Sequence, residues 1–155
     1  RKTEYYIKES LSRANNFFKN KGRDGSKFHS TLSQLFGDME LLENSLQHCQ
    51  LALIQVFPGF NSLEIQDNPK LENVYPESYI MTSCARKGQA LKKRYDIKKN
   101  IADLTNASEC FDLSFAAIKL IKQTYGTDEA KIYLGDYSHV YFEDAIEFFN
   151  ESIAI

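Results

Sequence analysis

Apolar residues recur along most of the chain at the spacing of one face of an α-helix. Between residues 3 and 20 they stand four, three and four positions apart, while Lys8, Arg13 and Lys19 lie off that face. No segment shows a convincing period-two alternation of a half-buried strand. The pattern predicts an all-α fold of about six or seven helices, over residues 3–20, 26–37, 39–57, 78–99, 101–125, 127–134 and 140–155.

Glycine and proline mark the expected ends of these helices. The glycine-aspartate pair at 37–38 indicates either a turn or a weak point within one long helix, and Gly126 is expected to form a left-handed C-terminal cap. A second glycine-aspartate pair, at 135–136, is expected to separate the last two helices. Residues 58–76 are rich in proline, glycine and asparagine, which predicts a long connection between two helices.

The length of 155 residues fits one helical domain. Because the sequence begins with Arg rather than Met and ends within an apolar helix, we expect residues 1–155 to be a fragment of a longer chain. The apolar stripes of the helices predict a core that includes Phe36, Leu46, Cys49, Phe115, Ile118 and Phe149.

Small and large residues recur in a similar order in three segments of the chain. They are Leu32, Ser33, Phe36, Ser45, Cys49, Ala52 and Pro58 in the first segment, Gly88, Leu91, Leu104 and Ala107 in the second, and Leu134, Gly135, Ala145, Ile146, Phe149 and Ala154 in the third. In the first segment a small residue follows a large one, an aromatic comes three positions later, and two small positions seven apart bracket a larger residue. This order resembles a degenerate tetratricopeptide repeat, although Cys49 stands where an aromatic residue is usual.

The resemblance implies a solenoid of antiparallel helix pairs, in which each pair buries the large residues of the next. It also implies a scaffold role, in which the chain binds a peptide or helix of another protein. An up-and-down helical bundle is the alternative fold. The alternative functions are a regulatory or substrate-docking segment of a larger enzyme, and a helical bundle that dimerises or lies on a membrane surface.

Charge is strongly banded along the chain, although the formal net charge is only −2. Residues 1–31 carry net +5, residues 32–80 carry −6, residues 81–99 carry +6 and residues 100–155 carry −7. Nucleic-acid-binding proteins usually have a basic surplus that is not so closely balanced, so no nucleic-acid partner is expected.

The densest basic segment lies on the helix expected over residues 78–99 and predicts a binding site there. Long cationic side chains on one helix can line a groove for an acidic ligand, so the expected partner is a protein with an acidic segment. The alternative is that these cations pair within the chain, with Asp103, Glu109 or the acidic final helix. The candidate binding residues are Arg86, Lys87, Lys92, Lys93, Arg94, Lys98 and Lys99.

The sequence contains no H-E-x-x-H, C-x-x-C, Walker or Rossmann pattern, so neither an enzyme nor a cofactor is expected. Asp136 and His139 have the spacing of a helical metal site, but one such pair supplies too few ligands, and no metal is expected. Cys49, Cys84 and Cys110 are odd in number, which predicts reduced thiols in a cytoplasmic protein. No apolar run reaches the length of a membrane span, so a membrane partner is not expected, and a homodimer is a further alternative.

Overall fold

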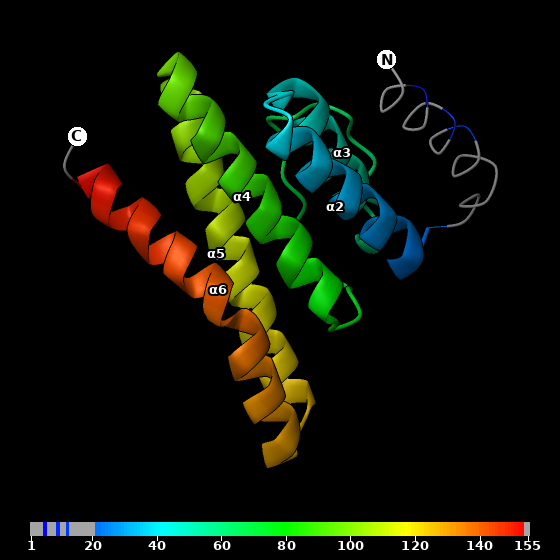
Figure 1. The fold of residues 1–155 in the computed structure, drawn as a ribbon. Helices are drawn as coiled ribbons and strands as arrows, with labels where there is room; N and C mark the ends of the chain where they lie inside the picture. The colour runs from blue at the N-terminus through cyan, green and yellow to red at the C-terminus, as the bar shows by residue number, and fades with distance from the viewer. Residues whose placement is uncertain (1–4, 6–8, 10–11, 13–20, 154–155) are drawn as a thin grey trace.

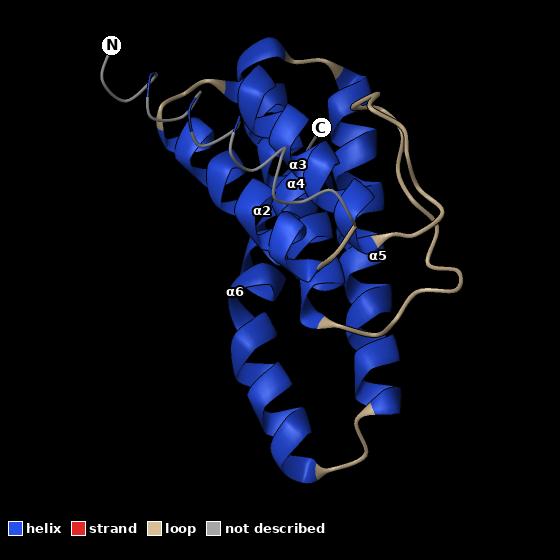
Figure 2. Ribbon diagram, turned by 90° about the vertical axis from the view of Figure 1, so that its right-hand side faces the viewer, coloured by secondary structure: helices blue, strands red, loops and turns tan. Residues whose placement is uncertain are grey.

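The computed structural model describes residues 5, 9, 12 and 21–153, and this part of the chain is helical and contains no strand (Figure 1). The predicted all-α class is confirmed. The helix expected over residues 3–20 falls outside the described residues, apart from three positions. Figure 2 shows the helices stacked side by side with a long loop on one flank. The helices are α2 (Arg23–Asp38), α3 (Leu42–Val56), α4 (Ser78–Lys98), α5 (Ile101–Thr124) and α6 (Asp128–Ile153).

The first two of these helices, α2 and α3, form an antiparallel pair in which small polar residues meet. Ser33 Oγ lies 3.1 Å from Ser45 Oγ and 2.8 Å from Cys49 Sγ, and the Ser45 hydroxyl donates to Ser33 O at 2.8 Å. Because these side chains are short, the two helices can approach closely there. The pair at 37–38 forms the last two residues of α2, and the turn to α3 follows it, since α2 ends at residue 38 and α3 begins at residue 42.

The second antiparallel pair is α4 and α5, and the two helices approach closely at Gly88. A Cβ built at Gly88 would lie 3.1 Å from the Phe111 ring and 3.3 Å from Ala107 O, so a glycine suits this crossing. The link between the helices is short because Lys99 adopts the left-handed conformation, with φ 53 and ψ 33. Asn100 then caps α5 by accepting a hydrogen bond from Ala102 N at 3.1 Å.

Two expectations about glycine in the last third of the chain are wrong. Helix α6 runs without a break through residues 135–136, and Gly126 has no positive φ. A glycine within a helix costs only about 1 kcal/mol relative to alanine, which packing of the later turns can offset. The described part of the third repeat-like segment, residues 134–153, therefore lies in one helix rather than forming a helix pair.

The core lies between the helix pairs and extends to α6. The predicted core positions Phe115 and Phe149 are only half-buried, and Phe148 takes the buried position on α6. Its ring centroid lies 5.2 Å from that of Phe111 on α5. The buried face of α6 is thus rotated from the expected face and centres nearer to Phe148 than to Phe149. The predicted core residues that are fully buried are Phe36, Leu46, Cys49 and Ile118.

A long connection, residues 57–77, links α3 to α4 along the flank of the two pairs (Figure 2). Buried polar groups on α3 anchor it. The Gln50 amide donates to Ser62 O at 2.9 Å and to Glu64 O at 2.8 Å. Because carbonyl groups of the loop receive these bonds, the connection is held in a defined path despite lacking secondary structure.

Candidate functional site

All seven candidate binding residues lie on α4 or directly after it, but two of them, Lys87 and Arg94, are buried. Lys87 is 0% exposed, and its Nζ donates to Gln50 Oε1 at 2.7 Å, to Asp67 O at 2.7 Å and to Asn68 Oδ1 at 2.8 Å. Burial lowers the pKa of this amine, while three acceptors satisfy its three donors. Lys87 therefore anchors the long connection to the core and does not face a partner.

Arg94 is also buried, at 8% exposure, and is held by carboxylates of the same chain. Its Nε donates to Asp103 Oδ2 at 2.8 Å and its Nη2 to Asp103 Oδ1 at 2.6 Å, a two-pronged pair between α4 and α5. Its Nη1 donates to Glu43 Oε2 at 2.8 Å. The hydrogen bonds that Arg94 donates to Asp103 raise the pKa of Arg94. The pairing with Asp103 that the alternative interpretation predicted is thus present.

The cations at the exposed end of α4 have partners as well. Lys92 Nζ lies 2.8 Å from Asp96, one helical turn away, and Lys98 Nζ lies 2.5 Å from Glu43. The bond from Lys98 lowers the pKa of Glu43. Lys99 lies over an aromatic ring of α4, 5.1 Å from its centroid. Exposed pairs of this kind contribute little to stability, but each of these cations already contacts a group of its own chain.

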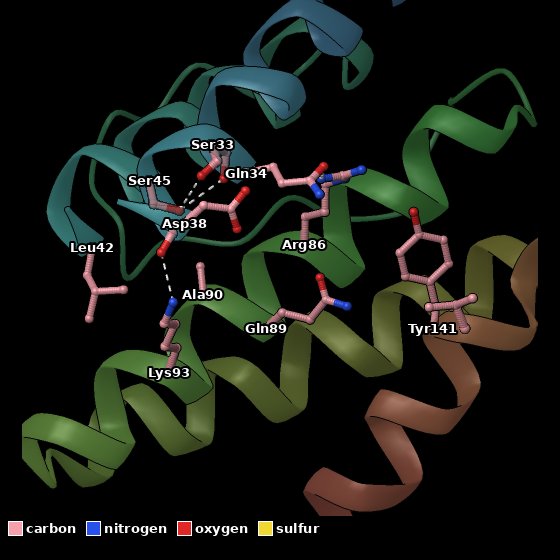
Figure 3. Close-up of a pocket in the computed structure, with 12 residues that line it drawn as sticks. Ser33, Gln34, Asp38, Leu42, Ser45, Arg86, Gln89, Ala90, Lys93 and Tyr141 are labelled. Atoms are coloured by element: carbon pink, nitrogen blue, oxygen red, sulfur yellow. Dashed lines mark hydrogen bonds between the residues drawn. The ribbon is translucent and has the colours of Figure 1, made fainter. Parts of the chain in front are cut away.

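The two remaining candidates, Arg86 and Lys93, line a groove of about 310 Å³ between α2, α4 and α6 (Figure 3). Arg86 Nη1 donates to Gln34 Oε1 at 2.8 Å, and Lys93 Nζ donates to Gly37 O at 2.8 Å. The second bond places an ammonium group at the C-terminal end of α2, where the helix dipole favours a positive charge. Both side chains therefore lean from α4 toward α2.

The walls of the groove combine apolar and polar groups. Leu42 of α3 and Tyr141 of α6 stand on opposite sides of the groove, with α4 between them (Figure 3), and Val140 of α6 also lines it. Val140 is 59% exposed, a large apolar side chain left open to solvent at the edge of the groove. Asp38 is the one acidic residue in the lining. Such a mixture suits an amphipathic ligand better than a uniformly charged one.

Arg86 and Lys93 differ from Lys92, Arg94 and Lys98 of α4 because they form no ion pair with a described carboxylate. Among the described residues, neither lies within ion-pair distance of a carboxylate, and Asp38 makes no ion pair either. Within the same part of the chain, Arg86 Nε is buried and has no hydrogen-bond partner. The lining of the groove therefore has two cations, Arg86 and Lys93, against the single carboxylate of Asp38, which is an excess of positive charge.

A buried histidine pair that the sequence did not predict joins α2 to α3 beside the groove. His29 Nδ1 lies 3.0 Å from His48 Nδ1, and the two rings are stacked at 5.2 Å. Burial, with a contribution from the neighbouring imidazole, lowers the pKa of His29 to about 4. Burial also lowers the pKa of His48. One ring must be neutral to accept the bond, so the pair stabilises the helix pair only when it is not fully protonated.

The three cysteines are free and buried, and their environment does not activate them. Burial raises the pKa of Cys49 to about 11 and that of Cys110 to about 12. Burial also raises the pKa of Cys84. Since the thiolate is the nucleophile, these thiols are structural rather than reactive. The described residues contain no group of three or more side chains that could hold a metal ion.

The structure thus divides the seven candidate binding residues into two groups, which the sequence alone did not distinguish. It brings Arg86 and Lys93 into one groove and directs the other five cations to contacts of their own. The stripe of α4 that carries these two residues also carries Gln89 and Ala90, at positions i+3 and i+4, so helical spacing could have identified them. Nothing in the sequence indicated that Tyr141 of α6 would reach the same groove.

Comparisons with other proteins add no relationship from which a function could be transferred. No protein-family model, curated protein or solved structure matches the chain. The resemblance to the tetratricopeptide repeat therefore stays a prediction from the sequence.

Proposed function

We propose that this chain is a protein-interaction module that binds an acidic segment of a partner protein in the groove between α2, α4 and α6. The observation that carries the proposal is the pair of groove cations, Arg86 and Lys93, which have no carboxylate partner among the described residues. A carboxylate brought by a ligand would supply the missing charge.

The groove favours such a ligand for two physical reasons. A charge-assisted hydrogen bond in a partly buried place contributes about 1.5–3 kcal/mol, against about 0.2–1 kcal/mol for a fully exposed ion pair. The apolar side chains of Leu42 and Val140 add contact area that a polar surface would lack. Because the groove is small, we expect a transient complex with a modest buried area rather than an obligate one.

The proposal extends to the arrangement of the helices, for which we keep the tetratricopeptide-like interpretation. The meeting of Ser33 and Ser45 in the first pair supports it, because the resemblance places small residues at these two positions. Gly88 and Ala107 support it in the second pair. An up-and-down bundle remains the alternative, and a scattering envelope of the chain separates a curved stack from a compact bundle.

The proposal also places the chain in a reducing compartment, the cytoplasm. Three free and buried cysteines support this location, since secreted proteins of this size usually pair their cysteines. No helix in the described part of the chain has the length and apolar character to cross a bilayer. We assign no catalytic step to the groove and no cofactor to the fold.

A peptide selection tests the proposed function. Random 16-residue peptides displayed on phage are selected on the immobilised chain, and the enriched sequences are resynthesised with a fluorophore for anisotropy measurements. We expect enriched peptides to be acidic and their affinity to fall as salt rises, because screening weakens exposed charges. The variant Arg86→Glu/Lys93→Glu should lose binding.

The matched control is Lys119→Glu/Lys122→Glu, which makes the same change in net charge on exposed residues of α5. This variant should bind as the unchanged chain does. Circular dichroism shows whether each variant keeps its helices, and Arg86→Gln/Lys93→Gln replaces the reversal if it does not fold. Enrichment of neutral or basic peptides, or equal loss in the control, would refute the proposal.

A further inference from the structure

The floor of the groove is formed by α4, whose lining residues follow a regular helical spacing. This spacing, together with the charge, indicates what shape of ligand would fit. Arg86, Gln89, Ala90 and Lys93 stand at positions i, i+3, i+4 and i+7 of α4, and all four line the groove (Figure 3). These are the spacings of one continuous helical face. With a rise of 1.5 Å per residue, the two cations are about 10.5 Å apart along the axis of α4.

We propose that the partner segment is itself an α-helix, which lies along α4 and presents two carboxylates seven residues apart to Arg86 and Lys93. This inference rests on the proposed function and specifies its ligand. In a helix that runs along α4, residues i and i+7 fall on one face at the same separation of about 10.5 Å. The spacing of the ligand would therefore match that of the cations without distortion of either helix.

An extended strand does not match this spacing. Its side chains alternate between two faces, so residues on the same face are about 6.6 or 13 Å apart. A carboxylate pair on a strand would reach one cation and miss the other. A polyproline helix comes closer, since its same-face residues are about 9.3 Å apart, but they form a single column.

The walls of the groove favour the α-helix over that single column. Apolar groups stand on both sides of α4, with Leu42 on the α3 side and Val140 on the α6 side. In an α-helix, positions i+3 and i+4 lie about 50° to either side of the line from i to i+7. Two apolar residues there would contact both walls while the carboxylates meet the cations.

The middle of the floor permits a close approach. Ala90 is small, and the Gln89 amide is already bonded to Asp144 of α6, so neither side chain projects far into the path of a second helix. The separation of packed helices depends on the side chains at their contact and is smaller where these are short. The ligand should therefore carry apolar rather than charged residues between its two carboxylates.

The two carboxylate positions are not equivalent. Asp38 stands at the Lys93 end of the groove, next to the carbonyl group that Lys93 bonds, and opposes a ligand carboxylate there. No acidic side chain of the lining stands beside Arg86, whose Nη1 is bonded to the neutral Gln34 amide. Arg86→Gln should therefore weaken binding more than Lys93→Gln does.

The experiment compares three 18-residue fluorescent peptides by anisotropy against the full chain. The first is an alanine-rich helix former with Glu at i and i+7 and Leu at i+3 and i+4. The second has the same composition with the two Glu residues five apart, which places them on different faces of a helix. The third is rich in proline, with Glu residues three apart. We expect the first peptide to bind about tenfold more tightly than the other two.

The outcomes separate the inference from the proposed function. Equal affinity for the first two peptides, or tighter binding of the proline-rich one, would overturn the helical ligand while the acidic groove stands. Absence of binding by every acidic peptide would overturn both. Loss of binding in Arg86→Glu/Lys93→Glu, with affinity retained in Lys119→Glu/Lys122→Glu, places the helical peptide in the groove. Equal loss in both variants would overturn that placement.

Discussion

Replacement of Lys87 by methionine should remove a large part of the stability of the fold. The substitution keeps the apolar stem of the side chain and deletes the ammonium group. Three buried or half-buried acceptors then lose their donor, namely Gln50 Oε1, Asp67 O and Asn68 Oδ1. Gln50 cannot simply turn away, because its amide nitrogen is held by carbonyl groups of the long connection.

The magnitude follows from the number of acceptors left without a partner. Each orphaned buried group costs about 1–3 kcal/mol, and the three costs are not additive because the network relaxes as a unit. Because Lys87 donates to neutral acceptors, its removal leaves no unpaired charge, and we adopt about 3 kcal/mol for Lys87→Met, the cost of one to three orphaned acceptors. Since domains are stable by only about 5–15 kcal/mol, the variant should unfold at much lower urea concentration.

Two measurements check this expectation. Urea denaturation gives the free energy of unfolding, and hydrogen exchange read by mass spectrometry reports on the connection, residues 57–77, which should lose protection first. Lys119→Met, on the exposed side of α5, is the control and should change stability by less than about 0.5 kcal/mol. A Lys87→Met variant that stays within 1 kcal/mol of the unchanged chain, with the connection still protected, would refute the reasoning.

Three further predictions concern the pairs of helices. The free energy of unfolding should fall by about 3 kcal/mol between pH 6.5 and pH 4. In this range His29 takes up a proton in the unfolded chain but not in the folded protein, where burial lowers its pKa to about 4. Urea midpoints measured across this range check the prediction. Asp103→Asn should cost about 3–5 kcal/mol by weakening the hold on a buried guanidinium, again by urea denaturation. Gly88→Val should cost about 1–3 kcal/mol by overpacking against Phe111, seen as a lower thermal midpoint.

Each of these predictions has a matched comparison. His29→Gln should flatten the acid dependence, and an unchanged slope in that variant would contradict the role of the histidine pair. Asp112→Asn, an exposed change on the same helix, should be neutral, and equal stability of the two asparagine variants would contradict the buried pair. Gly135→Val meets no neighbouring atom within 4 Å, so it should be tolerated better than Gly88→Val. Equal losses in the two valine variants would exclude overpacking as the cause.

The helices could be predicted from the sequence because their apolar spacing is local information. The bounds of α4 and α5 fall close to those expected, at residues 78–98 and 101–124. The continuity of α6 across residues 135–136 could not be predicted, because it depends on what the later turns pack against. The left-handed residue that ends α4 is Lys99 rather than a glycine, which local propensity does not indicate.

The division of the basic cluster was beyond the sequence for a different reason. Lys87 and Arg94 stand seven residues apart on one face, which is also the spacing of an exposed stripe. Their burial depends on Asn68 and Glu43, which lie 19 and 51 residues away in the chain. Arg86 and Lys93 have the same spacing but stay exposed or half-buried, and their partners on α2, Gln34 Oε1 and Gly37 O, are neutral. Spacing alone therefore indicated a site on α4, while tertiary contacts decided which residues of α4 were left to form it.

A charge-swap measurement tests the central claim, that Arg86 and Lys93 bind two carboxylates of a partner helix, most directly. The affinities of the unchanged chain and of Arg86→Glu/Lys93→Glu are measured for two helical peptides that differ only in having Glu or Lys at positions i and i+7. The account predicts that the affinity for the Glu peptide is at least about tenfold lower in the variant than in the unchanged chain. It also predicts that the variant binds the Lys peptide, which the unchanged chain does not bind. A variant that binds the Lys peptide no better than the Glu peptide would contradict the account.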